Sequence, residues 1–142
     1  MALVAGLIFV VLTATALLHV AWAFGVTWPA KDEQALVNAV LGVEGASKIP
    51  SPGLTLAVAG GMIAAGVIAL WGARVISLPL PHWICTAGLA VLAAIFLLRG
   101  VVTYLPVPMP EVQPFYRLNH LYYSPLILAI GAGYLALLTT RL

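Results

Sequence analysis

The sequence predicts an all-α integral membrane protein, a four-helix bundle with one short amphipathic helix in the first connection between spans. Of its 142 residues, 63% are hydrophobic and 7% are charged, whereas about a quarter of residues are charged in soluble domains. The few charges gather in the connections and at the ends of apolar runs. Four of these runs approach or reach the roughly 20 residues that a helix needs to cross a bilayer.

Length and composition also limit the class of function. We expect a single transmembrane domain over residues 1–142, because a chain of this length forms one domain. The formal net charge of +2 is small and scattered, which argues against nucleic-acid binding. The single cysteine, Cys85, excludes an internal disulfide and a thiolate metal cluster.

The first predicted span covers residues 2–24. It lacks the basic start of a signal peptide and is longer than the apolar region of one. Residues 21–23, Ala-Trp-Ala, look like a cleavage site, but we expect the segment to be retained, because His19 and Trp22 make better sense in the mature protein. Trp22 and Trp28 are expected at the membrane interface, which suits the apolar body and polar N–H of indole.

The first connection, residues 25–53, contains the predicted short helix over residues 32–43. Asp32 and Glu33 suit its N-terminus, and Gly42 suits its end. Its polar positions form one narrow stripe surrounded by apolar residues. We therefore expect this helix to lie on the membrane or to cover the mouth of the bundle.

The second predicted span covers residues 54–73 and carries small residues at a spacing of four, namely Ala57, Gly61 and Ala65. Small residues let the backbones of two membrane helices approach closely. We expect the neighbouring helix to belong to the same chain, and a second copy is the alternative.

The third predicted span covers residues 83–104 and contains Arg99 near its far end. The following segment, residues 105–114, is rich in proline and is expected to be extended, like polyproline. The fourth predicted span covers residues 120–140. Pro125 near its start predicts either a kink or a fresh helix start capped by Ser124.

Basic residues give little information on orientation. An even number of spans puts both termini and the turn after the second span on one side of the membrane. That side has Arg74 and Arg141, and the other side has Lys31, Lys48, Arg99 and Arg117. The full count favours the second side as cytoplasmic, but the two sides tie if Arg99 and Arg117 are pocket residues. We take the termini as cytoplasmic.

Polar side chains at the span ends opposite the termini form the candidate site. His19 and Arg99 lie at similar depths, about one and a half turns from the ends of their spans. Ionisable residues are costly in hydrocarbon, so they usually face the interior of a bundle and pair there. The predicted ligand-binding residues are His19, Trp22, Trp28, Arg99, Tyr104, Tyr116, Asn119, His120 and Tyr123.

The favoured function is binding of a lipid-like or amphipathic ligand, because apolar walls with a few converging polar groups are typical of small-molecule sites. Its anionic or carbonyl head would meet Arg99, His19 and Tyr123. A purely structural reading stays open for each residue: Arg99 would reach for the interface, His19 would bind a backbone carbonyl, and the tyrosines would form an interfacial belt.

Other functions also stay open. An accessory subunit of a larger membrane complex would explain the small size and the small-residue helix faces. His19 and His120 could ligate haem or a metal, but they match no established spacing, so no cofactor and no metal are predicted. An enzyme would use His19 as acid–base and Arg99 as electrostatic stabiliser, but no supporting motif is present, and no catalytic residue is predicted. The expected partners are the lipid bilayer, a lipid-like molecule, and a membrane protein or second copy.

Three blocks occur in order along the chain: His19-Val-Ala-Trp22-Ala-Phe-Gly25-Val-Thr-Trp28, Phe96-Leu-Leu-Arg99-Gly, and Tyr123-Ser124-Pro125-Leu126. Together they resemble the signature blocks of a bacterial membrane family catalogued as domain of unknown function 3995. The resemblance covers nearly the whole chain and implies a four-helix protein of the bacterial inner membrane, with no activity to carry over. The family pattern usually has an acid where this chain has Asn119, so the resemblance implies that Arg99 lacks its counter-ion and is free for an anionic ligand.

Overall fold

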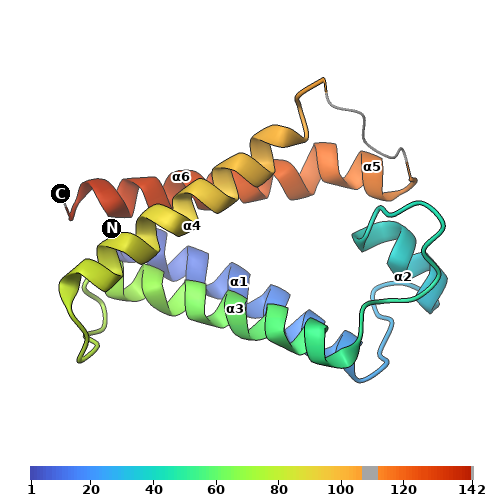
Figure 1. Cartoon of the computed structure of the whole chain (residues 1–142), viewed down its shortest axis with the longest axis horizontal. Helices are drawn as coiled ribbons and strands as arrows, with labels where there is room; N and C mark the ends of the chain where they lie inside the picture. Colours follow the sequence, from blue (N-terminus) through green and yellow to red (C-terminus); the bar gives the residue numbers. More distant parts are fainter. Residues whose placement is uncertain (107–111, 142) are drawn as a thin grey trace.

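The computed structural model describes residues 1–106 and 112–141. All regular structure in this part of the chain is helical, which confirms the predicted all-α fold (Figure 1). Four helical runs are long and apolar enough to cross a membrane, so this is a multi-pass membrane protein. They are α1 (Ala2–Ala23), α3 (Pro52–Gly72), α4 (His82–Val102), and a continuous run of α5 (Phe115–Leu118), the π-helix η1 (Asn119–Tyr123) and α6 (Ser124–Thr139).

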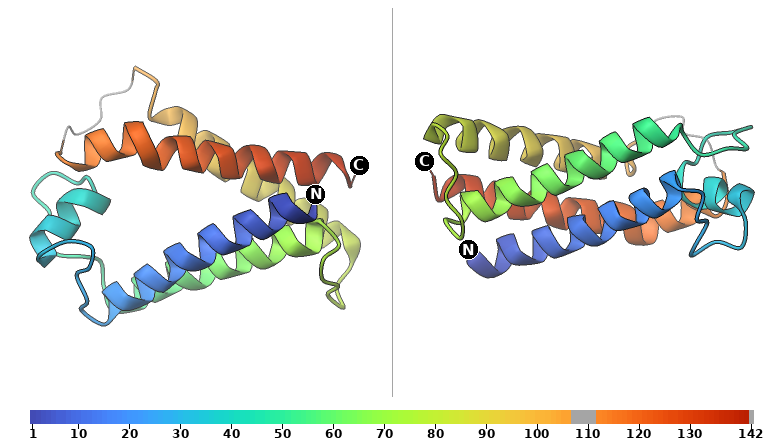
Figure 2. Two further views of the ribbon diagram at one scale, coloured as in Figure 1. Left: turned by 180° about the vertical axis from the view of Figure 1, so that it is seen from behind. Right: turned by 90° about the horizontal axis from the view of Figure 1, so that it is seen from below.

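The four long helices are arranged as two pairs. Helix α1 packs along α3, and α4 packs along α6, while the contacts between the pairs are fewer. The pairs meet at the end that carries both termini and diverge toward the other end (Figures 1 and 2). The buried core lies where they meet, formed by Ala5, Ile8, Leu12, Ala65, Ala69, Trp71, Cys85, Leu89, Ala93, Ile130, Tyr134 and Leu137.

Tyr134 joins the two pairs at this core. Its side chain is fully buried, and its hydroxyl donates a 2.8 Å hydrogen bond to the Ala65 carbonyl of α3. A buried phenol needs such a partner, because an unsatisfied hydroxyl in hydrocarbon is costly. This bond therefore holds α6 of one pair against α3 of the other.

Glycines set the close approach of α4 and α6. A Cβ added at Gly131 would lie 2.9 Å from the backbone nitrogen of Leu97, and one added at Gly100 would lie 2.5 Å from Cγ of Leu128. Neither distance is compatible with a real side chain, so the pair can pack at this distance only with glycine at both positions. This is the small-residue packing typical of membrane helices.

The small-residue stripe of α3 packs differently from the prediction. Ala65 is buried, but Ala57 and Gly61 are exposed, and a Cβ added at Gly61 would meet nothing within 4 Å. The close contact with α1 is instead made at Gly66, where an added Cβ would lie 2.9 Å from the ring of Phe9. The prediction that the stripe packs within the chain is therefore wrong at Ala57 and Gly61, because α1 packs on an adjacent face of α3.

Helix α2 (Glu33–Val40) is the predicted short helix, three residues shorter at its C-terminal end than the expected 32–43. Asp32 caps it as expected, since its Oδ1 accepts a 2.8 Å hydrogen bond from the Ala35 N–H. Its apolar residues Leu36 and Val37 are buried. The helix lies at the open end of the molecule, between the diverging pairs (Figure 1).

The fourth helical run begins at Phe115, ahead of the predicted start at 120, and passes through Pro125 without a fresh start. Pro125 has no N–H to donate to the carbonyl four residues back, and the π-helical turn before it accommodates this loss. Ser124 does not cap a new helix, so that alternative is wrong. Half of the expected extended segment 105–114, residues 107–111, lies outside the described residues.

Candidate functional site

Arg99 lies at the centre of a hydrogen-bonded polar network between α4 and η1. Its Nη1 donates to Oγ1 of Thr103 at 3.1 Å, and its Nη2 donates to Oδ1 of Asn119, also at 3.1 Å. The Asn119 amide donates in turn to Oγ1 of Thr103 at 3.0 Å. We call Arg99, Thr103, Asn119 and Ser124 the Arg99 network.

Ser124 completes the network. Its Oγ lies 2.8 Å from Oγ1 of Thr103 and 3.0 Å from Oδ1 of Asn119, and its single proton can be donated to only one of them at a time. Thr103, Asn119 and Ser124 are 4%, 2% and 0% exposed, whereas Arg99 is half-buried. The arginine is therefore the member that a ligand can reach.

Sequence reasoning missed Thr103 as a site residue and treated Ser124 only as a helix cap. Thr103 stands four residues after Arg99, a spacing that places two side chains on one helix face. That spacing was the available signal. Ser124 gave no comparable signal, because its partners come from the third and fourth spans.

The Arg99 network contains no negative charge. Among the described residues, both hydrogen-bond partners of Arg99 are neutral, one hydroxyl and one amide oxygen. The amide oxygen of Asn119 thus accepts a hydrogen bond from the guanidinium, as the carboxylate of an acidic residue at this position would. The neutral amide does not supply the negative charge of a carboxylate.

Tyr104, Tyr116 and His120 form a second group beside the network. The Tyr104 hydroxyl donates to the His120 carbonyl at 2.8 Å, and the two rings meet edge to face. The ring of Tyr116 stacks on that of His120 with centroids 4.2 Å apart. Nδ1 of His120 lies 2.8 Å from the Tyr116 carbonyl oxygen, which can only accept, so Nδ1 carries the proton.

Tyr123 holds α2 against the fourth helical run. Its hydroxyl donates to the Ala39 carbonyl of α2 at 3.1 Å, and its ring contacts Phe115. Phe115 in turn packs directly on Gly42, where no Cβ would fit. We call Tyr123, Phe115, Ala39 and Gly42 the α2 clasp.

His19, Trp22 and Trp28 form a separate group at the C-terminal end of α1. Nδ1 of His19 donates to the Thr15 carbonyl at 2.8 Å, and its ring lies 4.8 Å from that of Trp22. The Trp22 indole donates to the Trp28 carbonyl at 2.8 Å. No hydrogen bond or ring contact between described residues connects this group with the Arg99 network.

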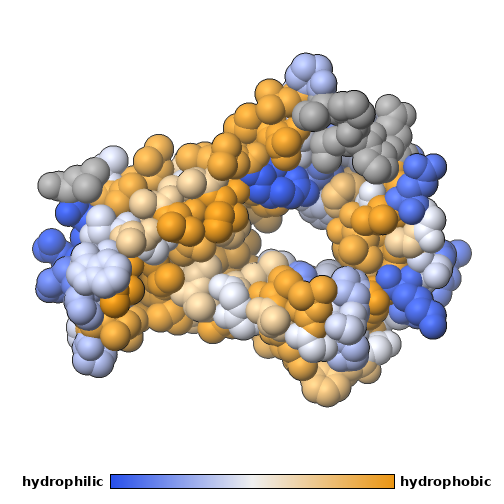
Figure 3. All heavy atoms as spheres, viewed as in Figure 1, coloured by the Kyte–Doolittle hydropathy of each residue, from blue (hydrophilic) through white to orange (hydrophobic). Residues whose placement is uncertain are grey.

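The molecule also has an opening. The space-filling view shows it passing through the molecule between the α1–α3 pair, the α4–α6 pair and α2, with hydrophilic atoms at its edge beside α4 (Figure 3). The surrounding surface is mostly hydrophobic. The nine predicted site residues fall into four groups with separate side-chain contacts instead of forming one contiguous layer.

His19 and His120 each have one ring nitrogen available as a metal ligand. Each uses Nδ1 to bind a main-chain carbonyl, which leaves Nε2 as the available ligand atom. His19 and His120 belong to different groups, and no cluster of three or more metal-binding side chains occurs among the described residues.

Comparisons with known proteins agree with the sequence blocks. A family model described as a protein of unknown function, DUF3995, matches residues 12–134. No curated protein and no solved structure matches the chain. The matched region is most of the chain and contains every residue of the Arg99 network, so the protein belongs to the DUF3995 family.

Proposed function

We propose that this membrane protein binds a lipid-like or amphipathic ligand between its two helix pairs, with the ligand head at Arg99. The observation that carries the proposal is the half-buried guanidinium inside a candidate membrane span, with only neutral partners among the described residues. A cation within hydrocarbon is costly unless it is paired. An anionic or carbonyl head would lower that cost through charge-assisted hydrogen bonds.

The opening supports an apolar body for the ligand. An empty space of this kind inside a bilayer is unfavourable, because the side chains that line it lose their dispersion contacts. Acyl chains or a similar apolar group would restore those contacts along the hydrophobic walls (Figure 3). A ligand with an apolar body and a polar head therefore matches both the opening and the network.

Aromatic groups on two of the long helical runs suit the same ligand. Tyr104 and Tyr116 flank His120 beside the Arg99 network, and Trp22 at the end of α1 donates to the Trp28 carbonyl. Aromatic rings with polar tips are favoured at this depth, where apolar and polar parts of a ligand meet. The α2 clasp would retain the ligand at the open end.

An accessory subunit of a larger complex is the second candidate. The observation that favours it is the uncovered small-residue face of α3, where added Cβ atoms at Gly60 and Gly61 would meet nothing within 4 Å. A helix of another protein could approach this face closely. A small discrete species on a native gel in mild detergent would favour the self-contained binder, and a large assembly would favour the subunit.

We also propose that the protein resides in the bacterial inner membrane with both termini in the cytoplasm. Arg74 and Arg141 lie at the end that carries the termini, and Lys31 and Lys48 lie in the connection at the other end, so the basic residues do not decide between the two orientations and a fusion does. An alkaline phosphatase fused after Arg141 should be inactive in that orientation. An active fusion would reverse the assignment.

The ligand proposal is tested by lipid mass spectrometry of the protein purified gently from its native membrane. Arg99→Gln should reduce the amount of the co-purified ligand about tenfold, which corresponds to loss of one charge-assisted hydrogen bond. Arg117→Gln is the matched control, because Arg117 is exposed and removing it changes the net charge equally.

Size-exclusion profiles and thermal melting of both variants establish that they are folded. Equal amounts of the same ligand in folded Arg99→Gln and wild-type protein would refute the proposal.

A further inference from the structure

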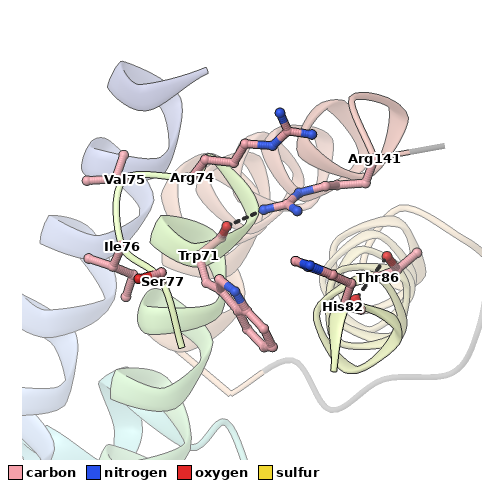
Figure 4. A pocket seen from close by; sticks show the side chains of 8 residues that line it. All are labelled: Trp71, Arg74, Val75, Ile76, Ser77, His82, Thr86 and Arg141. Carbon is pink, nitrogen blue, oxygen red and sulfur yellow. Dashed lines mark hydrogen bonds between the residues drawn. The ribbon is translucent and has the colours of Figure 1, made fainter. Parts of the chain in front are cut away.

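A polar pocket lies at the end of the molecule opposite the Arg99 network. It has a volume of about 520 Å³ and is built where α3 ends, α4 begins and the chain leaves α6 (Figure 4). The side chains that matter for its chemistry are Trp71, Arg74, Ser77, His82, Thr86 and Arg141. No part of the proposed ligand site contributes to it.

Arg141 is fixed in this pocket by the C-terminus of α3. Its Nε donates to the Gly72 carbonyl at 2.9 Å, and its Nη2 donates to the Trp71 carbonyl. Cationic side chains commonly satisfy the last carbonyls of a helix in this way. These bonds use Nε and Nη2 of the guanidinium, and Nη1 makes no hydrogen bond to a described residue.

Arg74 reaches the pocket from an unusual backbone conformation. It follows α3 with φ of 61°, in the left-handed region where glycine is usual, and its N–H bonds to the Trp71 carbonyl at 3.0 Å. Glycine would end the helix at lower cost, so arginine at this position adopts a backbone conformation that it does not favour. Its exposed side chain and that of Arg141 extend toward one another (Figure 4).

The charge at this end is not balanced by carboxylate side chains of the described residues. Asp32, Glu33 and Glu44 all belong to the connection between α1 and α3, at the far end of the molecule. The partial negative charge of the α3 C-terminus offsets only about half of one positive charge. Among the described residues, the two guanidinium groups beside this pocket therefore outweigh the partial negative charge of the helix end.

We propose that this pocket binds a phosphate group. Guanidinium groups match phosphate oxygens in geometry and charge, and Arg74 and Arg141 present two of them from different elements. The hydroxyl of Ser77 and the imidazole of His82 supply further donors around the same space, whereas the Thr86 hydroxyl already donates to the His82 carbonyl at 3.4 Å. A phosphate between the guanidinium groups of Arg74 and Arg141 would also reduce the electrostatic repulsion between them.

The surroundings favour the headgroup of an anionic phospholipid as the source of the phosphate. Val75 lines the pocket and is exposed, and the exposed Leu80 and Trp83 lie within two residues of His82 in the sequence, at the point where one candidate span ends and the next begins. Basic pockets between membrane helices bind lipid headgroups at this depth. A soluble phosphate ester would offer the same anion without the acyl chains.

The test measures binding of phosphatidylglycerol to the detergent-purified protein by native mass spectrometry, with phosphatidylcholine of the same acyl chains as the neutral comparison. Inorganic phosphate is titrated separately by calorimetry. Arg74→Gly is the main variant, because glycine adopts the left-handed conformation without cost and the fold is retained. Lys31→Gln removes one exposed positive charge at the other end of the molecule and is the matched control.

Phosphatidylglycerol should bind at least about tenfold more weakly to Arg74→Gly than to the wild type and to Lys31→Gln. Binding of inorganic phosphate with the same dependence on Arg74 would support the site and identify a soluble source. The proposal fails if neither probe binds more weakly to Arg74→Gly or to Arg141→Gln than to the wild type. It also fails if phosphatidylglycerol binds no better than phosphatidylcholine and inorganic phosphate does not bind. Because the proposed ligand site at Arg99 would itself accept an anionic lipid, the comparison is repeated in the Arg99→Gln background. Binding there should still weaken about tenfold when Arg74 is replaced by glycine, which separates the two sites.

Discussion

At the scale of single residues, the site depends on how one arginine is accommodated in a membrane span. Arg99 donates hydrogen bonds to a hydroxyl and an amide oxygen, so its partners among the described residues are neutral. The same amide links Thr103 and Ser124, which have almost no exposed surface. Asn119 therefore determines the position of the guanidinium and satisfies the buried hydroxyls around it.

Asn119→Ala should lower the free energy of unfolding by about 1–3 kcal/mol, because it leaves buried polar groups without partners. The measurement is unfolding by titration with a denaturing detergent. Asn38→Ala, which removes the same amide from an exposed hydrogen bond with Gln34, should change stability by no more than about 0.5 kcal/mol. Equal losses in the two variants would contradict the role assigned to the network.

At the scale of secondary-structure elements, two features of the chain build the open end of the molecule. The π-helical turn before Pro125 keeps the fourth run helical, and it carries Asn119 and Tyr123 to their partners on α4 and α2. The α2 clasp then attaches the short helix across the divergence of the two pairs.

Gly42→Ala should release α2 from the fourth helical run. The added Cβ would overlap the ring of Phe115, and the left-handed backbone at Gly42, with φ of 62°, would be strained as well. Hydrogen exchange of the amides of residues 33–40 should become faster by about tenfold, because the helix loses most of its packing contacts.

Gly45→Ala separates the two causes of this effect. Gly45 has φ of 76°, so alanine suffers a similar backbone strain, but its Cβ would meet nothing within 4 Å. We expect exchange in α2 to stay close to that of the wild type in this variant. The same acceleration in both variants would mean that backbone strain, and not the contact with Phe115, controls α2.

At the scale of the whole molecule, the protein is two helix pairs joined at one end. The Tyr134 hydroxyl and its bond to Ala65 lie at that junction, within the buried core. This arrangement concentrates the packing near the termini and leaves an opening between the two pairs toward the opposite end (Figure 3).

Tyr134→Phe should lower the free energy of unfolding by about 1 kcal/mol through loss of this hydrogen bond. The loss is moderate because the Ala65 carbonyl lies within a helix and retains its main-chain bond. Tyr122→Phe is the control, since Tyr122 is 63% exposed and its hydroxyl lies away from the core. A smaller loss at Tyr134 than at Tyr122 would show that the junction is held by apolar packing alone.

The sequence by itself determined the class of fold, the four spans and the short helix capped by Asp32, since these depend on local composition, apolar run length and capping chemistry. It also identified Arg99 and Asn119 as polar residues of one region. The link between them, through Thr103 and Ser124, depends on how α4 crosses the fourth run.

Only the tertiary structure decided how the helices share their faces. Small residues on α3 predict close packing on some face of the helix, but not which one, and α1 contacts Gly66 and leaves Gly61 exposed. In a bilayer, lipid covers an apolar face as readily as another helix does, so hydrophobicity cannot specify the partner. For the same reason the divergence of the two pairs, the opening between them and the meeting of Arg74 with Arg141 could not be predicted before the helices were placed in space.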